Sequence, residues 1–324
     1  MPMNDRILIT GGAGFIGSNI AAALLKRINT DVVIADDFSS GDWRNLIHVD
    51  CEVRAVFCDD AQLLQDIAAG HFTAIYHEAA ITDTTIMDQK HMMNVNTDAF
   101  AAILEASAKS GTRVIYASSA GTYGNSPAPN SIGTGEEPEN IYGFSKLVMD
   151  RIAARWYDKH SAPIIGLRYF NVYGPGEHHK NERQGNKTAS MMLQLHQRIQ
   201  AGEPVRLFKF GEQKRDFVYI RDVIGANLAA LNAKRSGVCN VGSGKARSFN
   251  DVIANINRIL NINVDVDYID NPFTFYQNHT EADLKETSAI LNWQPEWSLE
   301  QGMDDYYASL AKHHRGPVET MCAD

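Results

Sequence analysis

Residues 6–27 read RILITGGAGFIGSNIAAALLKR, an apolar run followed by a glycine-rich turn and a helical pattern. The turn carries Gly11, Gly14 and Gly17 with GxxGxxG spacing. Glycines so placed allow a tight turn, close approach of the backbone to a phosphate, and close packing of the helix on the strand. Because the helix begins directly after the turn, its N-terminal N–H groups favour an anion there. The stretch therefore predicts a strand–turn–helix unit that binds the pyrophosphate of a dinucleotide.

The same alternation continues through the first half of the chain. Short runs rich in β-branched and aromatic residues predict strands at 6–10, 32–36, 53–58, 74–80, 113–119 and 163–170. Helical patterns lie between several of them, at 18–27, 90–110 and 142–160. Apolar strands that alternate with amphipathic helices indicate a parallel sheet covered on both faces. We therefore predict an α/β protein with a doubly wound Rossmann sheet.

The rhythm loosens after residue 172, where polar loops separate shorter elements. Strands are expected at 205–210, 237–242 and 264–269, and helices near 188–201, 221–234, 248–260 and 298–312. We predict an NAD(P)-binding domain over residues 1–172, with a returning segment at about 215–247. Residues 173–214 and 248–324 are then expected to form a smaller α/β lid that binds the substrate.

Composition narrows the range of functions. The 324 residues are 44% hydrophobic and 21% charged, and the net charge is −9, which gives no global electrostatic case for nucleic-acid binding. No signal-peptide pattern opens the chain, and no run approaches the ~18 apolar residues that span a bilayer. The four cysteines (Cys51, Cys58, Cys239 and Cys322) show no CxxC spacing, so neither disulfides nor a zinc site is expected. These features favour a cytoplasmic protein.

Acidic residues at two predicted strand ends suit a dinucleotide. Asp36 stands 19 residues beyond Gly17, where a carboxylate can bind the adenosine ribose hydroxyls. Asp59 and Asp60 end the third strand, near the expected adenine. A carboxylate at position 36 favours NAD because it repels a 2′-phosphate. Arg44 is close enough in sequence to offset that repulsion, so NADP remains open.

Tyr142 and Lys146 are four residues apart in NIYGFSK and therefore share one face of a helix. A tyrosine with a pKa of ~10 is a poor base at neutral pH. An adjacent ammonium, reinforced by an oxidised nicotinamide, favours the phenolate, and the same lysine can hold the nicotinamide ribose. Ser119, at the end of a strand 23 residues earlier, can hold a substrate oxygen. We predict that these three residues are catalytic.

Together the motifs GGAGFIG, HEAAI, NVNT, YASS, YGFSK, RYFNVYGP and RDFVYIRD resemble the extended short-chain dehydrogenases/reductases that act on nucleotide sugars. The resemblance implies a tightly held NAD(P) that takes a hydride from a sugar carbon and returns it. The residues that it implies for cofactor binding are Gly11, Gly14, Phe15, Ile16, Gly17, Asp36, Asp37, Arg44, Asp59, Glu78, Ala79, Ala80, Asn96, Tyr142, Lys146 and Val172.

Further motifs resemble the ADP-L-glycero-D-manno-heptose 6-epimerase family. They are DTTIMD (83–88), YASSAGTYG (116–124), RYFNVYGPGEHHK (168–180), KTASM (187–191), LFKFGEQKRDFVY (207–219) and FYQNHTEADL (275–284). The resemblance implies inversion of the exocyclic C6 of ADP-heptose, a lipopolysaccharide precursor, and a preference for NADP with NAD possible. A 4,6-dehydratase is disfavoured because Ala120 and Gly121 stand where those enzymes carry an Asp-Glu pair.

Epimerisation at C6 requires proton transfer in two orientations of the oxidised sugar, which one fixed base cannot easily serve. Tyr142 is one proton-transfer group. In the family a lysine within GPxExxK supplies the other, and the match here ends at Lys180. The chain departs from the family nearby, since NERQ (181–184) is an apparent insertion and Gly176 stands where the family often has arginine. Lys187 is therefore a rival to Lys180, and both lysines also suit a pyrophosphate.

Other residues are expected at the nucleotide sugar. Arg215 matches the family's diphosphate-binding arginine, whose planar fork suits phosphate oxygens. The remaining substrate candidates are Thr84, Ser119, Asn171, Lys187, Phe208, Gly211 and Tyr276, with Thr85 as a further sugar contact or turn cap. His77 is read as a satisfied strand residue, and the adjacent His178 and His179 lack metal-ligand spacing, so no metal is expected.

Two other functions stay open at this point, namely a UDP-hexose 4-epimerase and a non-catalytic NAD(P)-sensing regulator. Ser119, Tyr142 and Lys146 argue against the regulator, because a sensor has no need of them. A homo-oligomer is expected.

Overall fold

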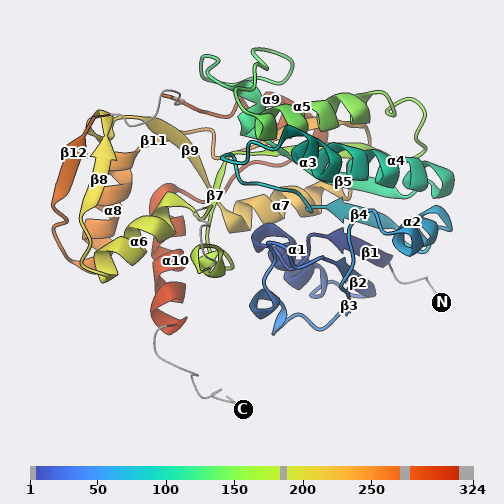
Figure 1. Cartoon of the computed structure of the whole chain (residues 1–324), viewed down its shortest axis with the longest axis horizontal. Helices are drawn as coiled ribbons and strands as arrows, with labels where there is room; N and C mark the ends of the chain where they lie inside the picture. Colours follow the sequence, from blue (N-terminus) through green and yellow to red (C-terminus); the bar gives the residue numbers. More distant parts are fainter. Residues whose placement is uncertain (1–4, 183–187, 271–277, 314–324) are drawn as a thin grey trace.

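The glycine-rich stretch joins strand β1 (Asp5–Thr10) to helix α1 (Phe15–Leu24) in a computed structural model that describes residues 5–182, 188–270 and 278–313 (Figure 1). Strand β1 lies inside a seven-stranded sheet of order β10-β6-β5-β4-β1-β2-β3. Every neighbouring pair in it is parallel. The other strands are β2 (Thr30–Ala35), β3 (Glu52–Arg54), β4 (Ala74–His77), β5 (Arg113–Ser119), β6 (Ile164–Tyr169) and β10 (Gly237–Val241). The predicted fold class is confirmed.

Both faces of this sheet are covered, as the continuously apolar strands indicated. Ile7 and Ile9 of β1 pack into the core with α1 and α7 (Ile220–Ala230), whereas Leu8 packs into the opposite core. That second core lies under α2 (Ala61–Ala68), α4 (Ala99–Ser110) and α5 (Ile141–Ala154). Figure 1 shows these two layers of helices on either side of the sheet. The carboxyl ends of β1 and β4 are neighbours, so the chain reverses direction across the sheet there, which is where such folds bind ligands.

Several predicted elements differ in detail, among them the strand expected at 74–80, which ends at His77, and the helix expected at 142–160, which ends at Ala154. The strand expected at 53–58 is only Glu52–Arg54, because it is the sheet edge and Val53 remains 43% exposed. The single helix expected at 90–110 is α3 (Gln89–Met93), a π-helical turn (Asn94–Asp98) and α4. Such π turns are often found at functional sites. Helix α2 was not predicted.

The second half builds smaller sheets. Strands β7 (Asn171–Tyr173), β9 (Lys214–Tyr219) and β11 (Ala246–Ser248) form one, and β8 (Val205–Phe208) pairs with β12 (Val266–Ile269) in another. The helices are α6 (Met191–Gln200), α8 (Phe249–Leu260), α9 (Lys285–Leu291) and α10 (Leu299–His313). In Figure 1, β8, β12, α6 and α8 gather at the end of the molecule far from β3. Strand β10 returns to the large sheet beside β6, while the domain boundaries themselves stay a prediction.

Candidate active site

The glycine turn approaches the backbone after β4 too closely for any side chain. A Cβ atom at Gly11, where φ is +70°, would lie 2.5 Å from the nitrogen of Ala79. At Gly17 it would lie 2.4 Å from the carbonyl oxygen of Gly11. Gly14 caps α1 without a side-chain hydrogen bond, which leaves the first-turn N–H groups available to an anion. These features fit the pyrophosphate of a dinucleotide.

Asp36 braces this turn from the end of β2. Its carboxylate is 6% exposed and accepts hydrogen bonds from the backbone N–H groups of Ala13 and Phe38, both at 2.8 Å. Asp37 accepts from Ser39 at 2.9 and 2.6 Å. Because both oxygens of Asp36 already bind backbone, its predicted contact with an adenosine ribose must share them.

Arg44 lies in the loop after β2 and is held by two carboxylates. It contacts Asp42 at 2.8 Å and Glu182 at 2.6 Å, and the guanidinium holds the pKa of Asp42 well below its usual range. Asp60 caps α2 by accepting from Leu63 at 3.0 Å, so it has a structural role beside its neighbour Asp59.

Ser119, Tyr142 and Lys146 are brought together at the end of β5. Lys146 is 1% exposed, donates to the carbonyl oxygen of Ala117 at 2.8 Å, and has its Nζ 6.0 Å from the centroid of the Tyr142 ring. Burial lowers the pKa of Lys146 to about 8, opposed first by the charge of Glu78. The three residues therefore lie close together, with Tyr142 hydrogen-bonded to Ser119, while their catalytic roles stay predictions.

The expected lowering of the Tyr142 pKa is not found in the protein alone. Burial raises the pKa of Tyr142, and only its hydrogen bond with Ser119 acts in the opposite direction. Desolvation of a phenolate outweighs an ammonium that lies 6.0 Å from the ring. The positive charge of an oxidised nicotinamide is the other group that was expected to lower the pKa of Tyr142.

Gly143 is a packing position beside the candidate site that the sequence reasoning missed. A Cβ atom there would lie 2.4 Å from the carbonyl oxygen of Gly121, in the turn that follows Ser119. The glycine therefore lets α5 approach that turn and brings Tyr142 close to Ser119. The available signal was a glycine in the first turn of an otherwise regular helix, where it lowers helix propensity.

Comparison with known proteins agrees with this geometry. The pattern of the NAD dependent epimerase/dehydratase family matches residues 7–242. The chain belongs to that family. It is 37% identical over 268 residues to the ADP-L-glycero-D-manno-heptose-6-epimerase of Thiobacillus denitrificans (strain ATCC 25259 / T1), covering 79% of this chain and 78% of that protein. The resemblance to that group of epimerases, inferred from the motifs, is confirmed.

Two solved structures of epimerases extend the comparison. The Helicobacter pylori ADP-L-glycero-D-manno-heptose-6-epimerase is 44% identical, with a TM-score of 0.88 over 95% of this chain and 97% of that one. The UDP-glucose 4-epimerase of Thermotoga maritima, solved with UDP-glucose, is 26% identical, with a TM-score of 0.86 over 95% and 99%. The fold is thus shared across epimerases of different sugars, and the higher identity lies with the heptose enzymes.

In this epimerase the segment after β7 packs on the start of α1. Asn19 donates to the carbonyl oxygens of Phe15 and Pro175, at 2.9 and 3.0 Å. Lys180 lies in a short helical turn with its Nζ 5.2 Å from the Phe15 ring centroid, and burial lowers its pKa. A Cβ atom at Gly176 would lie 2.8 Å from Asn19 Nδ2, so the arginine often found in the family would displace this contact.

Glu177 fixes the same segment. It is 1% exposed and accepts from the N–H and hydroxyl of Ser190, both at 2.6 Å, at the start of α6. Lys180 therefore sits beside the cofactor turn on a segment anchored at two points. Lys187 lies outside the described residues, so its predicted rivalry with Lys180 stays a prediction.

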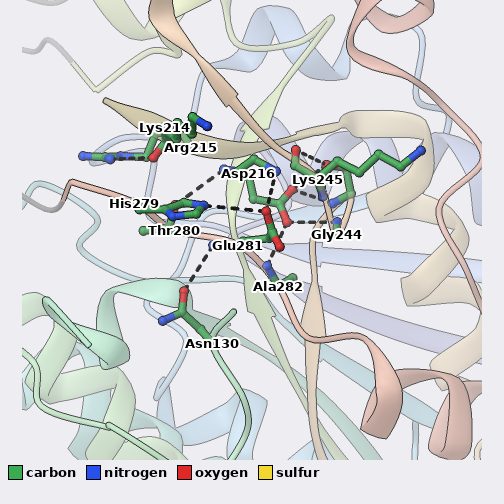
Figure 2. A network of polar contacts seen from close by, with 12 residues as sticks. Asn130, Lys214, Arg215, Asp216, Gly244, Lys245, His279, Thr280, Glu281 and Ala282 are labelled. Carbon is green, nitrogen blue, oxygen red and sulfur yellow. Dashed lines mark hydrogen bonds and ion pairs between the residues drawn. The ribbon is translucent and has the colours of Figure 1, made fainter. Parts of the chain in front are cut away.

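Arg215 lies on β9 and is 6% exposed. Its neighbour Asp216, which the sequence reasoning did not single out, is buried and accepts several hydrogen bonds (Figure 2). The Asp216 carboxylate accepts from the N–H groups of Ser243, Gly244 and Ala282 at 2.6, 2.9 and 2.9 Å. It thereby ties β9 to the turn after β10 and to the segment before α9. The hydrogen bonds of Asp216 therefore support the strand that carries Arg215.

Other substrate candidates are more dispersed. Asn171 is exposed at the start of β7, Thr84 is exposed, and Phe208 ends β8. Gly211, with φ +71°, has no room for a side chain beside Asn250. Tyr276 lies outside the described residues. Their substrate contacts stay predictions.

Asn96, on the π turn, has a visible structural role. Its amide accepts from Ile81 N–H at 2.8 Å and donates to the Ser145 hydroxyl at 3.0 Å, which links the loop after β4 to the catalytic helix. Thr85 bonds Asp83, as a turn cap does.

His77 is fully buried, with Nδ1 2.8 Å from the Thr10 hydroxyl and its ring stacked on Phe100. Burial lowers its pKa to about 3, and within the described residues its Nε2 has no hydrogen-bond partner, so His77 is a strand residue as predicted but is not fully satisfied. Within the described parts of the chain, no cluster of three or more His, Cys, Asp or Glu side chains suits a metal ion. Nor does any helix described here have the length and apolar character needed to cross a membrane.

Proposed function

We propose that this epimerase inverts C6 of an ADP-glycero-manno-heptose by transient oxidation and re-reduction, for the synthesis of a lipopolysaccharide core precursor. The observation that carries the proposal is the contact of Tyr142 with Ser119 and Lys146 on one segment, together with a second lysine, Lys180, held against the first turn of α1 on another. Tyr142 and Lys146 stand at the end of β5, and Lys180 stands on the Phe15 ring at the start of α1. The likeness to enzymes of that name supports it.

A bound nicotinamide would supply the acceptor and donor of the hydride. Gly11, Gly14 and Gly17 would hold its pyrophosphate, and the N–H bonds of Lys146 not used on Ala117 would hold its ribose. Lys146 is charged at neutral pH, since its pKa is about 8.

Tyr142 takes the proton of the C6 hydroxyl in one orientation of the sugar. Ser119 Oγ accepts from the N–H of Gly121 at 3.0 Å, which leaves its O–H to donate to an oxygen beside Tyr142. After the C6 ketone has turned, Lys180 returns a proton to its oxygen from the other side. Burial lowers the pKa of Lys180, so this ammonium gives up its proton more readily than an exposed one. Arg215 binds the diphosphate.

NADP is the proposed cofactor, with NAD as the alternative. Arg44 supports NADP because its guanidinium is fixed on the loop that follows β2, near the expected adenosine ribose. Asp36 is less of an obstacle than the sequence suggested, since its carboxylate is turned onto backbone N–H groups. Mass spectrometry of the cofactor released from the purified protein distinguishes the two.

Product analysis tests the activity. The purified protein is incubated with ADP-D-glycero-D-manno-heptose, and the C6 configuration of the product is assigned by NMR. We expect an equilibrium mixture of the two C6 epimers. UDP-glucose and UDP-galactose are tested in parallel, and turnover of these alone would favour a 4-epimerase. If no sugar nucleotide changes the absorbance of the bound cofactor, the protein is a sensor instead.

A further inference from the structure

Glu78 is a carboxylate in the middle of the candidate active site for which the mechanism above has no use. It follows β4, and its N–H donates to the Thr10 carbonyl oxygen at 3.0 Å, so the backbone is fixed beside the end of β1. The carbonyl carbon of Glu78 would lie 2.8 Å from a Cβ atom at Gly11. Glu78 thus stands at the reversal point of the sheet, next to the dinucleotide turn, and its side chain is half-buried.

A hydrogen-bonded chain leads away from this carboxylate into the core. Glu78 Oε1 lies 3.0 Å from the hydroxyl of Tyr169, which ends β6. The Tyr169 hydroxyl is also 3.1 Å from Oδ1 and 3.0 Å from Nδ2 of Asn227, on α7. Asn227 is fully buried and is held by its own bonds to Val223 and Tyr76. The chain is therefore rigid.

This chain can serve both protonation states of Glu78 without moving a heavy atom. When Glu78 is ionised, Tyr169 donates to it and the amide N–H of Asn227 donates to Tyr169. When Glu78 is protonated, its O–H donates to Tyr169, whose own O–H turns to Oδ1 of Asn227. A carboxylate with only fixed N–H donors would favour the ionised form alone, so the arrangement suits a group that changes its charge.

The charged and titratable groups around Glu78 come from three elements. Lys146 and Tyr142 are on α5, Tyr169 is on β6, and Tyr76 is on β4. Burial raises the pKa of Glu78 to about 7, and its charge raises the pKa of both Lys146 and Tyr142. Glu78 and Tyr142 thus lie near the same ammonium, that of Lys146. A negative charge on either acid favours the neutral form of the other.

We propose that Glu78, held by Tyr169 and Asn227, takes up a proton when Tyr142 becomes phenolate, so that Glu78 and Tyr142 together present one negative charge to Lys146 throughout turnover. The O–H bond of Tyr142 breaks, its electron pair stays on the phenolate oxygen, and the proton forms an O–H bond on Glu78. No electrons change hands. Glu78 is half-buried, so its carboxylate can exchange this proton with solvent water, and it releases the proton there when Tyr142 takes the proton of the C6 hydroxyl. Glu78 is in this sense a positioning residue that acts through Tyr142 and Lys146.

Two titrations of the purified protein with its cofactor test this role. Infrared spectroscopy records the carbonyl stretch of a protonated carboxylic acid, which we expect to disappear near pH 7 and to be absent from Glu78→Gln. Glu105→Gln, on the exposed face of α4, should leave the band unchanged. Tyr169→Phe removes a hydrogen bond that lowers the pKa of Glu78, so the band should persist to higher pH. A band that is missing, or unaffected by Glu78→Gln, overturns the proposal.

The second titration follows the phenolate of Tyr142 by ultraviolet absorbance, as the difference from Tyr142→Phe. In Glu78→Gln the competing charge is gone, and we expect the phenolate to form at a lower pH than in the parent protein. A purely structural role for Glu78 would lower activity without moving this midpoint. The role rests on the proposed function, in which Tyr142 exchanges its proton. Neither titration needs a substrate. Their results can therefore still be interpreted if the protein does not turn over ADP-heptose.

Discussion

The buried carboxylate of Asp150 offers the sharpest test of what holds α5, the helix of Tyr142 and Lys146, in place. Asp150 is 5% exposed and accepts from Arg168 Nε and Nη2 at 2.9 and 2.8 Å, from Tyr116 at 2.9 Å and from Ser118 at 3.0 Å. Arg168 is itself 1% exposed, and Glu136 is its other anionic partner, at 2.7 Å. Three donors from β5 and β6 therefore converge on one side chain of α5.

The substitution Asp150→Asn removes the charge and keeps the shape. The guanidinium of Arg168 is then left buried with one carboxylate in place of two. The new amide NH2 group also faces hydrogen-bond donors, because all described partners of the Asp150 carboxylate are donors. Breaking a buried ion pair from one side destabilises a protein by about 3–5 kcal/mol, because the remaining charge is not solvated. The side chains involved are 2% and 6% exposed, so solvent screening reduces this figure little. We expect a loss of about 3–5 kcal/mol in the free energy of unfolding.

Urea unfolding followed by far-ultraviolet circular dichroism measures this loss as a lower midpoint at unchanged slope. The matched control is Asp267→Asn, which breaks a pair with Arg206 at 3.2 Å whose side chains are both 57% exposed. Exposed pairs contribute about 0–1 kcal/mol, so the control should stay near the parent protein. If the two variants unfold at the same urea concentration, the network around Asp150 does not stabilise the fold as argued.

Four further outcomes are expected. Tyr142→Phe should lower kcat by at least ~100-fold while the cofactor remains bound, as checked by mass spectrometry; normal turnover would remove Tyr142 as the base. Gly143→Ala should lower both Tm and kcat, because its methyl group would meet a backbone oxygen at 2.4 Å. Lys180→Ala should impair epimerisation more than Lys187→Ala, and the reverse ranking would reassign the second proton-transfer group. His77 has a pKa of about 3 when folded and 6.5 as its ordinary value, so its contribution to stability is present above pH 6.5 and is lost as the pH falls. Between pH 7 and pH 5 this amounts to about 2 kcal/mol, which His77→Asn should abolish in urea unfolding.

The sheet was predictable because its signal is local and repeated. In a strand buried on both faces, successive residues must all be apolar because they point alternately to the two cores. Ile7, Leu8 and Ile9 meet that requirement. The glycine turn was predictable for a similar reason, since no other residue fits 2.4–2.5 Å from a backbone atom at Gly11 and Gly17. Where sequence spacing alone fixes geometry, as for Tyr142 and Lys146 on one helix face, the candidate site followed.

The rest depended on contacts between segments far apart in the chain. Asn96 bonds Ser145 from a π turn, and nothing in the helical pattern of 90–110 marks where that turn occurs. Asp216 was passed over beside Arg215, because a buried carboxylate that binds backbone N–H groups looks like any surface acid in the sequence. The short β3 likewise reflects its place at the sheet edge, which strand propensity does not specify.

The packing around α1 explains how the two proposed proton-transfer groups, Tyr142 and Lys180, are both positioned relative to the glycine turn. Parallel strands place their carboxyl ends along one edge, so β1, β4 and β5 bring the glycine turn, Glu78 and Ser119 side by side without any contact between those side chains being required. Lys180 reaches the same edge differently, through Asn19 and the Phe15 ring on the first turns of α1. The position of Lys180, the proposed second proton-transfer group, therefore depends on the same helix start that is predicted to receive the pyrophosphate. A substitution such as Asn19→Ala, which spares the glycines, should for that reason disturb proton return more than cofactor retention.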